Sequence, residues 1–289
     1  MSTQSLAWHL LVGAFKHRRM REGRRSIVVD RGMALGLPLC RDGHDGKGYD
    51  MSKATGAVIW RGASRWDGEP LVVVVTWHSG NRKTGDMAQT WILREDLAPL
   101  DAIASGDDSS ICGDCPHRRR QHADGSMRRT CYVNVGQAPA AVWKTLQRGG
   151  YPDMTPAEAS EFLEGRGVRL GAYGDPGMVP VEVWEALTAK AAMHTGYTHQ
   201  WRDLDDVWAS FIMASADTVE DRREARQRGW RSFYVAPVGE PVAEGSVLCL
   251  SEARGTSCLD CGACGGTKGR DTVAVDIFIN AHGGAKAYV

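Results

Sequence analysis

The sequence has no apolar run that approaches the roughly 20 residues needed to span a bilayer. The most apolar stretch near the start, residues 6–15, contains His9 and is followed by the basic segment 16–25. A signal peptide carries its basic residues before its apolar region, so the order here is wrong for one. We therefore expect a protein that has no membrane partner and works in the cytoplasm.

The chain also lacks net charge, because 35 Lys and Arg residues balance 35 Asp and Glu residues. The protein as a whole does not attract nucleic acid electrostatically, and any such attraction has to be local. Three common catalytic motifs are missing from the sequence: the P-loop, the G-x-S-x-G elbow and H-E-x-x-H. The GNRKTG stretch at 80–85 lacks the residue order of a P-loop, and we predict that it connects two strands of a hairpin.

Cysteine is the residue type that carries the most information among those present. Eight cysteines in a chain predicted to be cytoplasmic are more often metal ligands or catalytic groups than disulfide partners. Cys40 is isolated, and we set it aside. The other seven form two groups that we predict to be metal-binding: Cys112, Cys115 and Cys131 in the first, and Cys249, Cys258, Cys261 and Cys264 in the second.

The second group contains the run C-x2-C-x2-C from Cys258 to Cys264. In bacterial ferredoxins this spacing supplies three ligands of a [4Fe–4S] cluster, and a more distant cysteine supplies the fourth. Cys249, near the end of a predicted strand, is suited to be that fourth ligand. Structural zinc usually uses pairs of C-x2-C separated by a longer stretch. The spacing therefore favours an iron–sulfur cluster, with zinc or unligated thiols as the alternatives.

The first group has three cysteines and no obvious fourth. If it binds zinc, His117 or His122 could complete a Cys3His site. If it binds a [4Fe–4S] cluster, one iron lacks a protein ligand and can bind a small molecule. Radical S-adenosylmethionine enzymes use such an iron for the amino and carboxylate groups of the methionine. Their usual motif is C-x3-C-x2-C, and the C-x2-C-x15-C spacing found here departs from it.

The first cysteine group lies in a basic loop at 111–131 that contains five arginines. Arginine binds phosphate and carboxylate groups bidentately, so we predict that Arg118 and Arg128 contact a cofactor. A nucleic-acid backbone is a second ligand class for the same side chains. A solvated basic loop without a ligand is the simpler alternative, and the loop has no interleaved aromatic residues on which bases could stack.

Strands and helices alternate along the rest of the chain. The β-branched run at 71–77 predicts a buried strand with 89–93 as its hairpin partner, and Thr155 with Glu158 predicts a capped helix over 155–165. Further strands are predicted at 169–174, 195–199, 211–217, 232–237 and 247–251, with helices at 179–193, near 204–210 and at 218–230. This order predicts an α/β fold whose parallel sheet forms a partial or full (β/α) barrel, with cysteine-rich cluster-binding loops and an N-terminal hairpin.

The predicted domain boundary lies near the start of this pattern. We assign residues 56–289 to a single α/β domain that binds iron–sulfur clusters or zinc. Residues 1–55 carry a basic run and no sustained apolar periodicity, so we predict a basic N-terminal extension. It is either flexible or the product of a start codon upstream of a natural start at Met51.

Catalytic groups of barrel-like α/β folds gather at the carboxyl ends of the parallel strands. The residues at these predicted ends are Asp175, His199 with Gln200, Ser215 with Asp217, and Cys249. We predict catalytic roles for Asp175, His199 and Asp217, and cofactor contact for Ser215. Each residue alone is also explained as a turn former or helix N-cap, so the hypothesis depends on their shared position.

A series of motifs gives the chain a family resemblance; in sequence order they are NRKTGDMAQTWIL, CGDCPHR, CYVNVGQAP, RLGAYGDP, TGYTHQW, ASAD, GWRSF and the C-x2-C-x2-C run. The chain resembles a group of uncharacterised bacteriophage and prophage proteins, similar in layout to the mycobacteriophage gene-product-88-like family. The resemblance covers roughly residues 56–284. It implies a phage or prophage origin, and hence the cytoplasm of a bacterial host, but no established reaction.

Two functions from different classes follow. The first is a radical-SAM-like iron–sulfur enzyme that acts on a nucleotide or nucleic acid, with one or two [4Fe–4S] clusters and S-adenosylmethionine as cofactors. The alternative is a zinc-stabilised nucleic-acid-binding protein without catalytic activity. A third hypothesis is a non-catalytic protein that acts on a host partner, for which the sequence offers no test.

Overall fold

The computed structural model describes residues 54–122, 124–267 and 275–282. All of them belong to one compact unit, Gly48–Val289. The predicted extension 1–55, with Cys40 and Met51, lies outside the described residues except for its last two. Within the described ranges, no helix combines the length and the apolar character that crossing a membrane requires.

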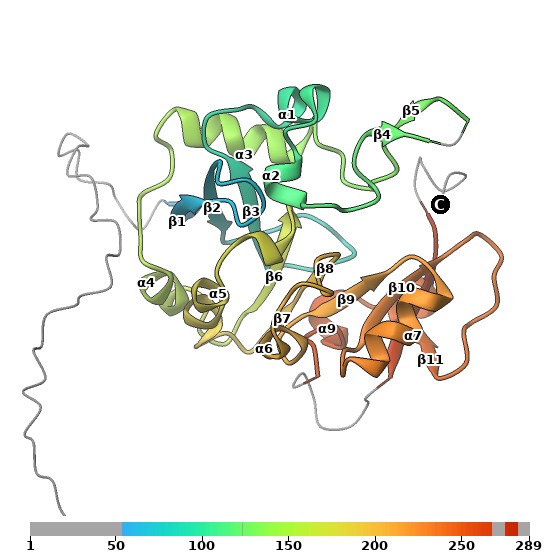
Figure 1. Cartoon of the computed structure of the whole chain (residues 1–289). Coiled ribbons are helices and arrows are strands. Elements are labelled where there is room, and N and C mark those ends of the chain that lie inside the picture. Colours follow the sequence, from blue (N-terminus) through green and yellow to red (C-terminus); the bar gives the residue numbers. More distant parts are fainter. Residues whose placement is uncertain (1–53, 123, 268–274, 283–289) are drawn as a thin grey trace, which may run out of the picture. The chain divides into compact units, whose positions relative to one another are not determined.

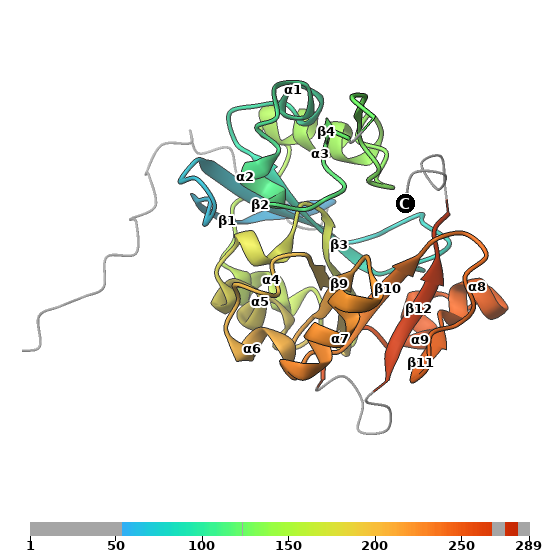
Figure 2. The same cartoon turned by 45° about the vertical axis from the view of Figure 1, so that its right-hand side comes forward.

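Two five-stranded sheets form the framework of this part of the chain (Figures 1 and 2). The first has the order β1-β2-β3-β6-β7, with β1 Gly56–Ala63, β2 Pro70–Thr76, β3 Ala88–Arg94, β6 Gly167–Tyr173 and β7 Met193–Thr195. The second has the order β11-β12-β10-β9-β8, with β8 Tyr197–Thr198, β9 Met213–Ala216, β10 Ser232–Ala236, β11 Ser246–Leu248 and β12 Asp276–Asn280. The strands β1, β2 and β3 pair antiparallel, and the other neighbours in both sheets pair parallel.

The predicted N-terminal hairpin is confirmed as β2 and β3, which pair from Leu71 with Arg94 to Thr76 with Gln89. Residues Leu71 to Val75 are fully buried, because both faces of this strand are covered and the β-branched side chains fit a pleated, packed surface. The GNRKTG stretch lies in the connection between the two strands, as predicted. Its role in the structure is to support the second cysteine group, as described below.

The two sheets adjoin at Gly196, the single residue between β7 and β8. The predicted strand 195–199 is therefore divided between the sheets. The Gly196 N–H donates to the Cys264 carbonyl at 3.2 Å, and its own carbonyl accepts from the Met213 N–H at 3.0 Å. A Cβ at this position would lie 2.5 Å from Ile212 Cγ2, so the close approach of neighbouring strands requires glycine.

The helices follow the signals in the sequence, with shorter bounds than predicted. Thr155 caps α4, Pro156–Glu161, through a complete capping box with Glu158. The other predicted helices are present as α5 Val181–Thr188, α6 Asp206–Ala209 and α7 Val219–Gln227. In both views α4 and α5 lie together (Figures 1 and 2). The alternation of parallel strands and helices confirms the α/β class.

One predicted strand is partly wrong. Residues 247–251 do not form one strand, because β11 ends at Leu248 and α8, Leu250–Arg254, begins directly after Cys249. The Cys249 N–H donates to the Phe278 carbonyl at 2.8 Å, and this is the last sheet bond before the chain turns. Elements without a sequence prediction are β1, β12, α1 Pro99–Ser105, α2 Ser109–Cys112, α3 Ala138–Gln147, the short pair β4 Arg120–Gln121 and β5 Met127–Arg128, and α9 Cys258–Cys261.

We predict that the substitution Gly196→Ala lowers the free energy of unfolding by about 1–3 kcal/mol, because the added methyl overpacks against Ile212. Urea denaturation measures the change. Gly80→Ala is the matched control: a Cβ there meets no atom within 4 Å, so we expect a change within about 0.5 kcal/mol. A G196A protein as stable as the parent would contradict the close packing at this junction.

Candidate functional site

The first cysteine group begins with a tight turn at the end of α2. The Cys115 N–H donates to the Cys112 carbonyl at 3.2 Å. Between them, Gly113 has a φ of +56°, and a Cβ there would lie 2.4 Å from Gln200 Oε1. Gln200 Nε2 in turn donates to the Cys112 carbonyl at 3.1 Å. The glycine therefore allows the chain after β8 to dock directly on the cysteine turn.

Cys131 returns to this turn through the short hairpin of β4 and β5. The carbonyl of His117 accepts two N–H groups, from Thr130 at 3.2 Å and from Cys131 at 3.0 Å. The structure thus brings Cys112, Cys115 and Cys131 together, as the sequence predicted. Burial raises the pKa of the Cys112 thiol well above its ordinary value, and the neighbouring charges of Cys115 and Cys131 raise it further. We call these three residues the three-thiol group.

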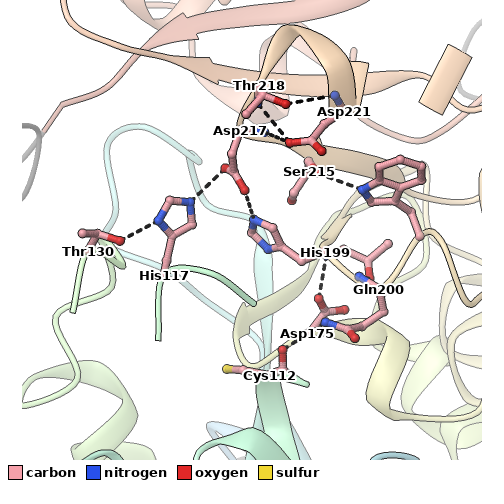
Figure 3. A network of polar contacts seen from close by, with 12 residues as sticks. Cys112, His117, Thr130, Asp175, His199, Gln200, Ser215, Asp217, Thr218 and Asp221 are labelled. Carbon is pink, nitrogen blue, oxygen red and sulfur yellow. Dashed lines mark hydrogen bonds and ion pairs between the residues drawn. The ribbon is translucent and has the colours of Figure 1, made fainter. Parts of the chain in front are cut away.

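A His–Asp–His cluster lies beside the three-thiol group (Figure 3). His117 Nε2 lies 2.9 Å from Asp217 Oδ1, and His199 Nε2 lies 3.3 Å from Asp217 Oδ2. Thr130 Oγ1 contacts the other ring nitrogen of His117 at 2.7 Å. The predicted catalytic residues His199 and Asp217 therefore meet, and His117, which the sequence offered only as a zinc ligand, joins them.

The charges of this cluster depend on one another. Burial raises the pKa of Asp217, but the contacts with His117 and His199 outweigh it, so the pKa is lowered and the carboxylate is ionised. Burial lowers the pKa of His199, but the interactions with Cys115 and Asp217 outweigh it, so the net pKa is raised. The contact between Cys115 and His199 joins the His–Asp–His cluster and the three-thiol group into one site.

Asp175 is at the end of β6, where the sequence placed it, and it is buried. Its Oδ1 accepts the Gly177 N–H at 2.8 Å. Its Oδ2 accepts the His199 N–H, also at 2.8 Å (Figure 3). Burial raises the pKa of Asp175 against the lowering effect of these bonds and of Thr198. Because both carboxylate oxygens accept backbone N–H groups, we assign Asp175 the role of positioning His199.

Ser215 lies within β9, and its carbonyl accepts the Trp201 indole N–H at 3.0 Å.

The basic loop uses its arginines internally. Arg118 donates to Asp108 Oδ1 at 2.9 Å and to the carbonyls of Gly113 and Gly106. Arg128 pairs with Asp124 at 2.5 Å. These contacts tie the loop to its surroundings, and cofactor contact by Arg118 or Arg128 stays a prediction. The other proposed zinc ligand, His122, lies in the turn between β4 and β5.

The second cysteine group lies after β11 and is supported by a segment from the first part of the domain. Cys249 follows β11, while Cys258 and Cys261 begin and end α9. The connection between β2 and β3 supports α9, because the Lys83 carbonyl accepts the Cys258 N–H at 2.8 Å and the Thr84 carbonyl accepts the Leu259 N–H at 3.1 Å.

The other three cysteines of the second group are close enough to Cys264 to affect the pKa of its thiol. Burial raises the pKa of the Cys264 thiol to about 12. A hydrogen bond with Tyr197 lowers it, and the charges of Cys258, Cys249 and Cys261 raise it. We call Cys249, Cys258, Cys261 and Cys264 the four-thiol group. None of the seven cysteines in the described ranges forms a disulfide.

Arg169 on β6 lies between the two thiol groups. Its Nη2 donates to the hydroxyl of Tyr132, the residue after Cys131, at 2.6 Å. Its guanidinium lies 5.9 Å from the ring centroid of Tyr197, the partner of Cys264, and it lowers the pKa of Cys258, which burial raises. Sequence reasoning missed this residue because a single arginine in a strand carries no motif. The RLGAYG segment after the predicted helix would have been the place to look.

The spacing of the candidate ligands differs between the clusters. Among the residues that the structure describes, the set whose ligand atoms all lie within 4.8 Å of one another is His117, His199 and Asp217. No three of the seven thiols form such a set. The sulfur atoms within each thiol group are therefore farther apart than the ligand atoms of the His–Asp–His cluster.

No family model, curated protein or solved structure matches the chain. The phage resemblance thus stays a prediction. Function has to be argued from the two thiol groups and the His–Asp–His cluster.

We predict that Asp175→Asn lowers the free energy of unfolding by about 1–3 kcal/mol, because the amide nitrogen of asparagine cannot accept one of the two backbone N–H groups. Chemical denaturation measures the loss. Asp101→Asn is the control, since Asp101 is exposed in the first turn of α1, and we expect a change within about 0.5 kcal/mol. Equal stability of both variants would contradict the positioning role of Asp175.

Proposed function

We propose that this protein is an iron–sulfur enzyme of radical-SAM-like design. The three-thiol group holds a [4Fe–4S] cluster whose fourth iron has no cysteine ligand and binds the amino and carboxylate groups of S-adenosylmethionine. The four-thiol group holds a second, fully ligated [4Fe–4S] cluster. When bound, these groups supply one-electron and radical chemistry that amino-acid side chains do not provide.

The observation that carries the proposal is the number and spacing of the thiols. A tetrahedral zinc ion with bonds of about 2.3 Å places its sulfur ligands about 3.8 Å apart. Within the described part of the chain, no three thiols come within 4.8 Å of one another. A [4Fe–4S] cluster distributes its thiolates over separate irons and needs a wider arrangement. The spacing therefore supports clusters in preference to zinc.

The position of the three-thiol group supports an enzyme. Its loop follows β3, the first of a series of parallel strands. The series consists of β3, β6 and β7 in the first sheet and β8, β9, β10 and β12 in the second. We assign this series to one partial barrel, because a single residue, Gly196, separates the strands at the border of the two sheets. In such a barrel the strand ends that carry Asp175, His199 and Asp217 form the reaction face.

The side chains of this face have separate tasks in the proposal. Asp175 positions His199, and the carboxylate of Asp217 faces both imidazoles. These side chains line the place where the substrate binds next to Cys115. We assign the substrate to nucleotides or nucleic acid by analogy with the phage-type layout alone.

The decisive test is purification without oxygen, followed by assays of iron, sulfide and zinc and a visible spectrum. We expect about eight irons per chain and broad absorbance near ~400 nm. Cys131→Ser and Cys258→Ser should each reduce the iron content by about half, because each removes a ligand from one cluster. About two zinc ions and no colour would refute the enzyme and favour the zinc-stabilised nucleic-acid-binding alternative.

Reduction in the presence of S-adenosylmethionine then tests the open iron. We expect the parent protein to cleave S-adenosylmethionine and Cys131→Ser to lose this activity. Cys258→Ser, which leaves the three-thiol group intact, should retain its first cluster and bind S-adenosylmethionine. Cleavage by C131S at the parent rate would place the reaction elsewhere.

A further inference from the structure

The His–Asp–His cluster is built from three separate segments. His117 comes from the loop after the cysteine turn, His199 from the end of β8 and Asp217 from the end of β9. In Figure 3 both imidazoles point at the two oxygens of one carboxylate. Their ring centroids are 5.4 Å apart with the planes at 70°, so the rings do not stack on each other.

We infer that His117, His199 and Asp217 form a binding site for one divalent first-row metal ion, with no ligand from either thiol group. This site goes beyond the proposed function and does not depend on whether the thiols bind iron.

The distances fit a metal site. Nitrogen and oxygen ligands lie about 2.1 Å from such an ion, so neighbouring ligand atoms are about 3.0 Å apart in octahedral and about 3.4 Å apart in tetrahedral geometry. The two nitrogen–oxygen separations in the cluster are 2.9 and 3.3 Å. The third pair, between the two imidazole nitrogens, lies within 4.8 Å.

Hydrogen bonding alone does not explain why the ring of His199 lies next to Asp217. Its Nε2 is buried and has no hydrogen-bond partner among the described residues, although Asp217 Oδ2 is only 3.3 Å away. The nitrogen is therefore close to the carboxylate without being aligned with it. A buried ring nitrogen without a hydrogen-bond partner needs an explanation, and a shared metal ion satisfies both the imidazole and the carboxylate.

The surrounding contacts orient the ligands. Thr130 Oγ1 contacts His117 Nδ1 at 2.7 Å, which leaves Nε2 as the ligand atom. Asp175 fixes the backbone of His199. Metal-binding imidazoles usually have a partner on the second ring nitrogen, as Thr130 is for His117.

The ligand types define the class of ion. Two imidazoles and one carboxylate suit Fe²⁺, Mn²⁺ or Zn²⁺ and leave coordination positions open. Water or a phosphate, carboxylate or hydroxyl oxygen of a substrate can occupy those positions. Because Cys115 contacts His199, the ion would hold such an oxygen next to the three-thiol group.

Mn²⁺ is the probe of choice, because carboxylate and imidazole ligands bind it whereas thiolates select softer metals. The full chain is purified without oxygen, freed of loosely bound metal and titrated with Mn²⁺, with free Mn²⁺ followed by electron paramagnetic resonance. We expect one saturable Mn²⁺ per chain. His117→Ala and Asp217→Asn should abolish this binding, and Thr130→Val should weaken it about 10- to 100-fold.

A matched control is available on the surface. His78 pairs with Asp86 at 2.9 Å, and both side chains are more than half exposed. His78→Ala removes a His–Asp pair without touching the cluster, so Mn²⁺ binding should not change. Circular dichroism checks folding of every variant, and Thr130→Val, the mildest change, answers the question if the other variants unfold.

Iron and sulfide are assayed in the same samples to separate the two proposals. No saturable Mn²⁺ binding, or equal binding by the parent, H117A and D217N, would overturn the metal site. Loss of iron in H117A together with Mn²⁺ would also overturn it, because His117 would then belong to the three-thiol group. One Mn²⁺ per chain in a protein without iron would support the site while refuting only the proposed function.

Discussion

The contact between Gln200 and the cysteine turn is the interaction on which the site depends. It joins the loop after β3 to the end of β8, two segments that are far apart in the sequence, and it requires the absence of a side chain at Gly113. Through this contact Cys115 reaches His199, and His199 reaches Asp217. The polar residues at the strand ends and the thiols of the loop therefore form one chemical environment.

Backbone groups from distant segments shape both thiol groups. The His117 carbonyl fixes Cys131, the Phe278 carbonyl fixes Cys249, and the Lys83 carbonyl fixes Cys258. Short cysteine motifs define which thiols are available, but the hydrogen bonds of the surrounding fold define where they point. Arg169 adds one positive charge between the groups and contacts a tyrosine beside each of them. Tyr132 follows Cys131 of the three-thiol group in the chain, and Tyr197 forms a hydrogen bond with Cys264 of the four-thiol group.

Local signals predicted the local features well. The buried run in β2 and the capping box of α4 act over a few residues, and both are present. The strand-end rule placed His199 and Asp217 together, because parallel strands share one edge. The rule did not show that Asp175 would use both oxygens on backbone N–H groups, or that Arg118 would bind Asp108 and two carbonyls. The Gly177 contact is the N-cap role that the sequence offered as the alternative for Asp175. His199 is 24 residues from Asp175, and Asp108 is 10 residues from Arg118, so no local motif indicates either of these contacts.

The support of α9 by Lys83 and Thr84 has a consequence for biosynthesis. The four-thiol group needs the connection between β2 and β3 and cysteines that are synthesised much later, from Cys249 to Cys264. Contacts of such sequence separation form late and slowly. The last thiols leave the ribosome after most of the domain, including the three-thiol group, has been synthesised. The three-thiol group is complete once Cys131 has been made, whereas the four-thiol group is complete only with Cys264, so we expect the three-thiol group to assemble first.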